Sequence, residues 1–212
     1  MSIDPVDQIT HSIEAAIQLV RELFTDAEHF APKDWSSYSQ TNRRAYIRAC
    51  FALFEGSLNV MSRIAKYYMP IRESLFTPSD ELALNEQNYV LDDSGRVRLV
   101  RARHTFIARL HFAPGALARA NAVDNPFKFE GKGYDALNRA KGVRDRLGHP
   151  REAKDMSITD DEVVATQNAM IWFKDHAQAL FTLCGARMIS NGRLLAEGKA
   201  LSWEPMKSAA TK

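Results

Sequence analysis

The segment from Lys141 to Arg151 contains two side chains whose types and spacing suit phosphodiester chemistry without a metal ion. Its sequence is KGVRDRLGHPR, with Arg144 five positions before His149. Arginine keeps its positive charge in proteins and can neutralise charge that develops on a phosphate, while histidine titrates near neutrality and can move a proton. We therefore predict that Arg144 and His149 are catalytic.

The residues around His149 predict that it lies just beyond the end of a helix. On a continuous helix, a spacing of five places two side chains roughly 140° apart, so they would not share a target. Gly148 permits the conformation that ends a helix, and Pro150 prevents the helix from resuming. His149 is then free to turn towards the face that carries Arg144.

An arginine, a polar residue, three further positions and a histidine at a helix end resemble the motif of the HEPN superfamily. Asp145 is the polar residue between Arg144 and His149. The order of predicted elements also suits the family from about residue 40 to residue 184: two long helices, an insert with a hairpin, the motif helix and a closing amphipathic helix. The resemblance implies a metal-independent endoribonuclease that cleaves single-stranded RNA.

In the mechanism that this resemblance implies, a ribose 2′-hydroxyl attacks the adjacent phosphate. His149 acts as general base or acid, Arg144 stabilises the charge on the phosphorane oxygens, and Asp145 orients its neighbours. A two-fold homodimer brings two motifs into one cleft. The expected partners are RNA, a second copy of the chain and, if the protein is a toxin or a defence protein, a protein antitoxin or inhibitor. No cofactor is expected.

Two alternatives stay open at this point. One is a non-catalytic HEPN-like dimer that binds a nucleotide, a nucleic acid or a partner protein. In that case Arg144 pairs with Glu55, a carboxylate inside an apolar helical stripe that needs a cationic partner, and Gly148 and Pro150 only stop a helix. The resemblance instead implies that Glu55 supports the Arg144 site. The other alternative is a duplex DNA-binding protein that uses the basic residues from Arg96 to Arg119.

The stretch from Arg96 to Val123 contains no acidic residue. Its basic residues are Arg96, Arg98, Arg101, Arg103, His104, Arg109, His111 and Arg119. This block is either a solvated face or a track for nucleic-acid phosphates. We take Arg101 and Arg109 as candidate RNA contacts, together with Arg146 and Arg151 beside the motif. The two histidines are too few for a zinc site, and no metal is predicted.

The helical wheel of the motif helix, which is predicted to begin near Gly133, separates two arginines. The core stripe consists of Ala136, Ala140, Val143 and Leu147. Arg144 lies on a flank of this stripe, with Asp145 opposite, whereas Arg146 groups with Arg139 on the solvent side. Arg144 is therefore expected to be partly buried, and Arg146 is expected to face solvent and help hold RNA.

The fold class predicted by the hydrophobic pattern is all-α, a single-domain helical bundle of four to five main helices with a small hairpin-like insert. The predicted elements are, in chain order, a helix from residue 5 to about residue 30, helices over 41–68 and 80–87, a hairpin over 89–99, and helices over 100–121, 133–148 and 159–185. One HEPN-like domain is expected over 1–212, with a core over about 5–185 and a tail over 186–212.

Several residues are predicted to set helix ends. Asp4 is expected to cap the first helix and Pro70 to stop the second. Thr159 and Glu162 form a capping box at the start of the closing helix. Gly185 is expected to end that helix.

Composition indicates an ordinary globular protein, with 45% apolar and 25% charged residues and a net charge of +2. Cys50 and Cys184 fall in apolar helical stripes and are expected to be reduced core thiols. The N-terminus lacks the pattern of a signal peptide, and the longest uncharged runs are too short to span a bilayer. We expect a cytoplasmic protein with no membrane role.

Overall fold

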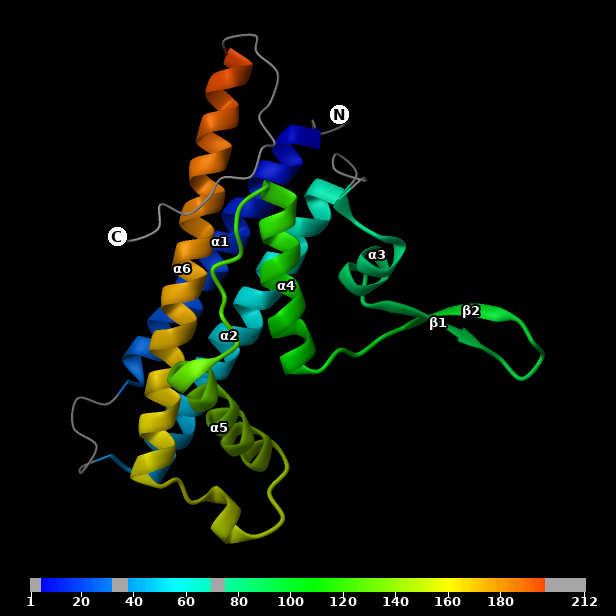
Figure 1. Cartoon of the computed structure of the whole chain (residues 1–212). Coiled ribbons are helices and arrows are strands. Elements are labelled where there is room, and N and C mark those ends of the chain that lie inside the picture. Colours follow the sequence, from blue (N-terminus) through cyan, green and yellow to red (C-terminus); the bar gives the residue numbers. More distant parts are fainter. Residues whose placement is uncertain (1–4, 32–37, 70–74, 197–212) are drawn as a thin grey trace. The chain divides into compact units, whose positions relative to one another are not determined.

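The computed structural model describes residues 5–31, 38–69 and 75–196, and these residues are mainly helical (Figure 1). The described helices are α1 (Pro5–His29), α2 (Gln40–Tyr68), α3 (Pro78–Leu84), α4 (Phe106–Asn121), α5 (Gly131–Gly148), the short 3₁₀ helix η3 (Ala153–Met156) and α6 (Asp160–Ala196). Strands β1 (Gln87–Leu91) and β2 (Val97–Arg101) form an antiparallel hairpin. The predicted all-α class with a small hairpin is confirmed.

The predicted boundary between the hairpin and the next helix is wrong. Val100 pairs with Asn88 in the hairpin, and α4 begins only at Phe106. Thr105 has an extended conformation and its hydroxyl accepts from the N–H of Ala108 at 3.2 Å, so it caps the helix. Between Val100 and Phe106 only Ala102 is apolar, so the helical pattern of apolar residues starts at Phe106, directly after this cap.

The closing helix does not end at Gly185, because α6 continues to Ala196. A glycine inside a helix costs about 1 kcal/mol, which packing can offset. The buried face continues from Cys184 past this glycine to Arg187 and Asn191, and the three residues follow helical spacing. Two of these three residues are polar, so the hydrophobic pattern stops before the helix does. The predicted tail over 186–212 is therefore wrong for residues 186–196, which are helical. The rest of that tail and the predictions for Asp4 and Pro70 lie outside the described residues.

The chain divides into two compact units, which are described separately. Unit 1 comprises Met1–Ser57 and Phe127–Gln178, and unit 2 comprises Leu58–Pro126 and Ala179–Lys212. Helices α2 and α6 contribute residues to both units. The prediction of a single domain stays a prediction.

Unit 1 has an aromatic core, and α5 joins it through Tyr134, whose ring centroid lies 5.8 Å from that of Trp172 on α6. The ring of Phe173 on α6 lies 4.7 Å from that of Phe54 on α2 and 5.8 Å from that of Phe127, between ring centroids. The predicted core stripe of α5 is buried, including Leu147 in its last turn. Because this stripe is buried, the polar side chains of α5 lie away from it.

Unit 2 has a smaller core between α2, α3 and α4. Its buried members are Ala65, Leu84, Ala116 and Ala120, with Tyr68, Met69, Phe76 and Phe112 packed against them. Pro114 lies inside α4 without splitting it. The small residues of α4 allow the close approach of neighbouring side chains.

The two cysteines are buried and unpaired, as predicted. Burial raises the pKa of both thiols to about 12, so they are neutral and unreactive at physiological pH. None of the helices in the described ranges combines the length and the apolar content needed to cross a membrane.

Candidate functional site

Arg144, near the end of α5, joins that helix to α2 within unit 1. Its Nη2 donates to Oε1 of Glu55, and its Nη1 donates to Oδ1 of Asp145 at 3.1 Å. The guanidinium carbon lies 5.8 Å from the centre of the Phe51 ring. The prediction that Glu55 has an arginine partner is confirmed. The Arg144 side chain is 38% exposed, so it is partly buried as expected and still reaches solvent.

Asp145 accepts hydrogen bonds from two cations of the same helix. Lys141 Nζ contacts its Oδ2 at 2.5 Å, and Arg144 contacts its Oδ1. Partial burial opposes ionisation of Asp145, but the hydrogen bonds from Lys141 and Arg144 outweigh it and lower the pKa of this carboxyl group. The helical wheel placed Asp145 opposite Arg144, but a wheel gives only the directions of the two Cβ atoms. The long Arg144 side chain bridges the distance between these positions.

His149 lies just beyond the last turn of α5, as predicted. It is the C-cap residue, with φ −136° and ψ 58°, and its N–H donates to the Asp145 carbonyl at 3.1 Å. Gly148 is still helical and does not have a positive φ, so the helix ends through His149 and the following Pro150. His149 is exposed and accessible to a substrate.

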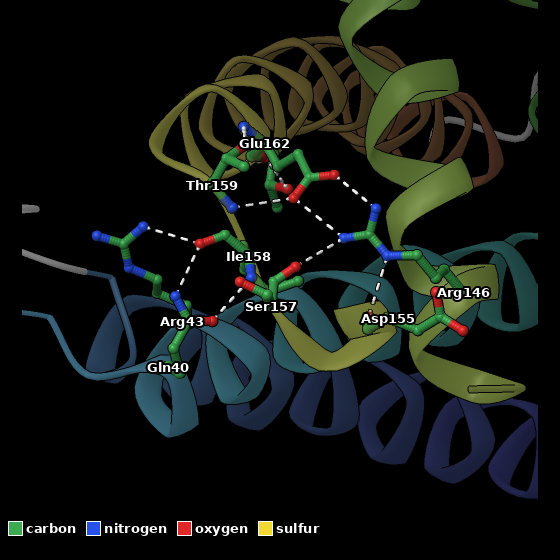
Figure 2. Close-up of polar contacts among 9 residues, drawn as sticks. Gln40, Arg43, Arg146, Asp155, Ser157, Ile158, Thr159 and Glu162 are labelled. Carbon is green, nitrogen blue, oxygen red and sulfur yellow. Dashed lines mark hydrogen bonds and ion pairs between the residues drawn. The ribbon is translucent and has the colours of Figure 1, made fainter. Parts of the chain in front are cut away.

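Arg146 does not face solvent beside Arg139, and that prediction is wrong. Figure 2 shows its guanidinium surrounded by acceptors from the segment that follows α5. Nε donates to the Asp155 carbonyl at 3.1 Å, and Nη2 donates to the Ser157 carbonyl at 3.0 Å. Nη1 and Nη2 also contact the two carboxylate oxygens of Glu162, at 2.8 and 3.1 Å.

The contacts of Arg146 leave it little capacity to bind RNA. A guanidinium has five N–H donors, and four of those in Arg146 are engaged. The helical wheel misplaced this side chain because it treats the helix as isolated, whereas the chain after His149 folds back over this side of α5. Arg146 therefore holds the segment that contains η3.

Glu162 and Asp155 are the acidic residues of this segment. Partial burial opposes ionisation of Glu162, but hydrogen bonds from the Arg146 side chain and the Thr159 N–H lower its pKa. The predicted capping box is present, because the Glu162 N–H also donates to the Thr159 hydroxyl at 3.3 Å (Figure 2). The N–H groups of Arg151 and Glu152 lower the pKa of Asp155. The Arg151 side chain itself is exposed.

The start of α2 also fixes this segment, through contacts that the sequence did not predict. The Ile158 carbonyl accepts from Gln40 Nε2 and Arg43 Nη1, both at 3.0 Å (Figure 2). The Ile158 N–H donates to Gln40 Oε1 at 2.7 Å, and Arg43 also pairs with Asp160 at 2.6 Å. The partners are separated by more than 110 residues, so no local pattern reveals them.

Arg101 and Arg109, the other candidate RNA contacts, belong to unit 2, whereas the motif belongs to unit 1. Arg101 pairs with Glu86 at 3.2 Å, and Arg109 donates to the side-chain oxygen of Asn59. Two further arginines of the basic block pair with acidic residues that precede the block: Arg98 with Asp92 and Arg119 with Asp80. Counting only described partners, half of the six arginines in the block thus pair with a carboxylate, and the block is not a uniform cationic track.

The end of α5 therefore combines an anchored, half-exposed guanidinium with an exposed imidazole. The first can stabilise negative charge, and the second can exchange a proton. No family model matches this chain, and neither a curated protein nor a solved structure matches it. The chemistry of these two side chains is thus the basis for a functional assignment.

Proposed function

We propose that the chain is a HEPN-like ribonuclease that cleaves single-stranded RNA through Arg144 and His149. The observation that carries this proposal is the arrangement at the end of α5. Glu55 and Asp145 hold the Arg144 guanidinium from two sides, and His149 lies exposed beyond the last turn. A cation that is already fixed in position needs no reorganisation when charge develops on a substrate, which favours transition-state stabilisation.

The proposed reaction is an internal transesterification. The ribose 2′-oxygen forms a bond to phosphorus and loses its proton, and the bond from phosphorus to the 5′-oxygen breaks as that oxygen gains a proton. His149 transfers one of these protons, and Arg144 stabilises the phosphorane oxygens. The products are a 2′,3′-cyclic phosphate and a 5′-hydroxyl. Glu55 and Asp145 are positioning residues, because they contact Arg144.

The proposal includes a homodimer. One chain supplies one arginine and one histidine of the motif, and a two-fold axis beside the end of α5 would bring two copies of each to a single RNA strand. A role as a toxin or defence protein, with a protein inhibitor as partner, is part of the same proposal and follows from the resemblance of the motif.

The decisive experiment compares RNA cleavage by the wild type and by His149→Ala. An exposed side chain beyond a helix end contributes little to packing, so the variant should keep its melting temperature and lose cleavage. The control is His29→Ala, which removes an exposed histidine from the end of α1. Cleavage by folded His149→Ala at the wild-type rate would refute the proposal. Retention of RNA by the wild type without any product would favour the non-catalytic alternative.

A further inference from the structure

Unit 2 contains a pocket of about 500 Å³ with walls from α2, α3 and α4. Arg63 and Lys66 reach it from α2, Leu84 lies at the end of α3, and Arg109 and Phe112 come from α4. A pocket of this volume is of the size that holds small organic ligands. The ligand that suits it can be inferred from the charges and the apolar surface of its walls.

Three cations line the pocket, and the described residues include no carboxylate partner for any of them. Arg63 and Lys66 are three residues apart on α2, so they share a face of that helix. Arg109 donates to the neutral amide oxygen of Asn59. Within the described ranges, none of these three side chains forms an ion pair. The carboxylate in the pocket wall, Glu86, contacts Arg101. The pocket therefore has a positive potential that attracts an anion.

One wall of the pocket is apolar. Leu84 belongs to the buried core of unit 2 and is 7% exposed, and Phe112 packs against the same core while also facing the pocket. Because these side chains are fixed by the core, their exposed surface is available to a ligand without rearrangement. A ligand with only a charged group would leave this wall in contact with water, whereas an apolar body would cover it.

We propose that this pocket binds a small phosphate monoester with an apolar body. A phosphate monoester carries close to two negative charges at neutral pH and has three terminal oxygens. These oxygens can accept from two guanidinium groups and one ammonium group, which a carboxylate with two oxygens cannot match. The apolar body then lies against Leu84 and Phe112. This site does not depend on the proposed ribonuclease activity, since the motif belongs to unit 1.

Isothermal titration of the full chain with phenyl phosphate tests this site. We expect saturable binding of one molecule per chain, with a dissociation constant below about 1 mM. The double variant Arg63→Gln/Lys66→Gln should bind at least about tenfold more weakly, because charge-assisted hydrogen bonds are lost. The control variant Arg48→Gln/Arg96→Gln removes the same charge from exposed side chains elsewhere and should bind like the wild type.

Comparison of ligands on the wild type keeps the test independent of any variant. Inorganic phosphate should bind at least about tenfold more weakly than phenyl phosphate, because it leaves the apolar wall uncovered. Equal binding of the two ligands would overturn the proposed ligand class. If both double variants lose the same affinity for phenyl phosphate, the loss is a general effect of charge, and the proposed site is wrong. Displacement of phenyl phosphate by an RNA oligonucleotide with a 5′-hydroxyl would also overturn it, because the pocket would then be a contact for the RNA backbone.

Discussion

Arg146 near the end of α5 contacts both carboxylate oxygens of Glu162 in the first turn of α6, at 2.8 and 3.1 Å. Their side chains are 34% and 23% exposed, so water screens the pair only in part. The same guanidinium donates to two backbone carbonyls of the intervening segment. Arg146 therefore joins two helices and the segment after His149, the proposed catalytic residue.

The Arg146→Lys variant should lose stability although it keeps the charge. A single ammonium cannot replace the planar fork that reaches Glu162 and two carbonyls together. We expect the free energy of unfolding to fall by about 1 to 3 kcal/mol. Urea denaturation measures this change, and Arg139→Lys, an exposed position on the same helix, is the control. Equal unfolding midpoints for the two variants would show that the Arg146 contacts contribute nothing.

Acid should lower the stability that the contact between Arg146 and Glu162 provides. The pKa of Glu162 is lowered in the folded state, so its contribution to stability is fully present above the pKa that it has in the unfolded chain. That contribution is lost as pH falls through the lower folded-state pKa. Stability should therefore decrease below about pH 4, and Glu162→Gln should make the decrease shallower. Urea midpoints between about pH 2 and pH 7 test this. Asp161→Asn, at an exposed neighbour, should leave the profile unchanged.

Two glycines of α5 should respond to alanine in opposite directions. A Cβ at Gly133 would lie 2.6 to 2.7 Å from the ring and Cβ of Trp172, which is buried. Gly133→Ala should therefore destabilise the protein, by about 1 to 3 kcal/mol. A Cβ at Gly142 would meet no atom of the described residues within 4 Å, so Gly142→Ala should stabilise the protein by about 0.5 to 1 kcal/mol. If the two variants shift the melting temperature in the same direction, the result would contradict the packing of α5 against α6.

The sequence predicted those features that depend on neighbouring residues. The Thr159 and Glu162 capping box is set within four positions, and the placement of His149 beyond a helix follows from the adjacent Pro150. The need of Glu55 for a cation follows from its place in an apolar stripe. Each of these predictions rests on backbone chemistry or on helical periodicity.

Features set by distant partners were missed. Arg146 was placed in solvent because its acceptors belong to a segment whose path is fixed by Gln40 and Arg43, more than 110 residues away from Ile158. The continuation of α6 past Gly185 was missed because polar residues carry the buried face there. Tertiary packing determined both outcomes, and local propensity did not reveal it.

The proposed mechanism predicts the chemistry of the RNA products. Attack by the 2′-hydroxyl leaves a 2′,3′-cyclic phosphate, and this step requires only the proton transfer and charge stabilisation assigned to His149 and Arg144. Cleavage should therefore continue in excess EDTA. Mass spectrometry of the RNA fragments identifies their ends. Fragments with 3′-hydroxyl ends, or activity abolished by EDTA and restored by a divalent metal, would indicate metal-assisted hydrolysis instead.

The roles of Arg144 and Arg146 can be separated by the same substitution at each position. Arg144→Lys keeps the charge, but one ammonium cannot contact Glu55, Asp145 and a phosphate with the geometry of a guanidinium. Loss of such a contact to an oxyanion costs about 3 to 4 kcal/mol, so turnover should fall by about two to three orders of magnitude.

Single-turnover cleavage, corrected for the folded fraction, should remain close to wild type in Arg146→Lys, because that side chain is occupied by Glu162 and backbone carbonyls. Melting temperatures measured in parallel separate lost stability from lost catalysis. If Arg144→Lys lowers only the melting temperature and folded molecules cleave RNA at the wild-type rate, Arg144 is a structural partner of Glu55. The active face would then lie elsewhere than at the end of α5.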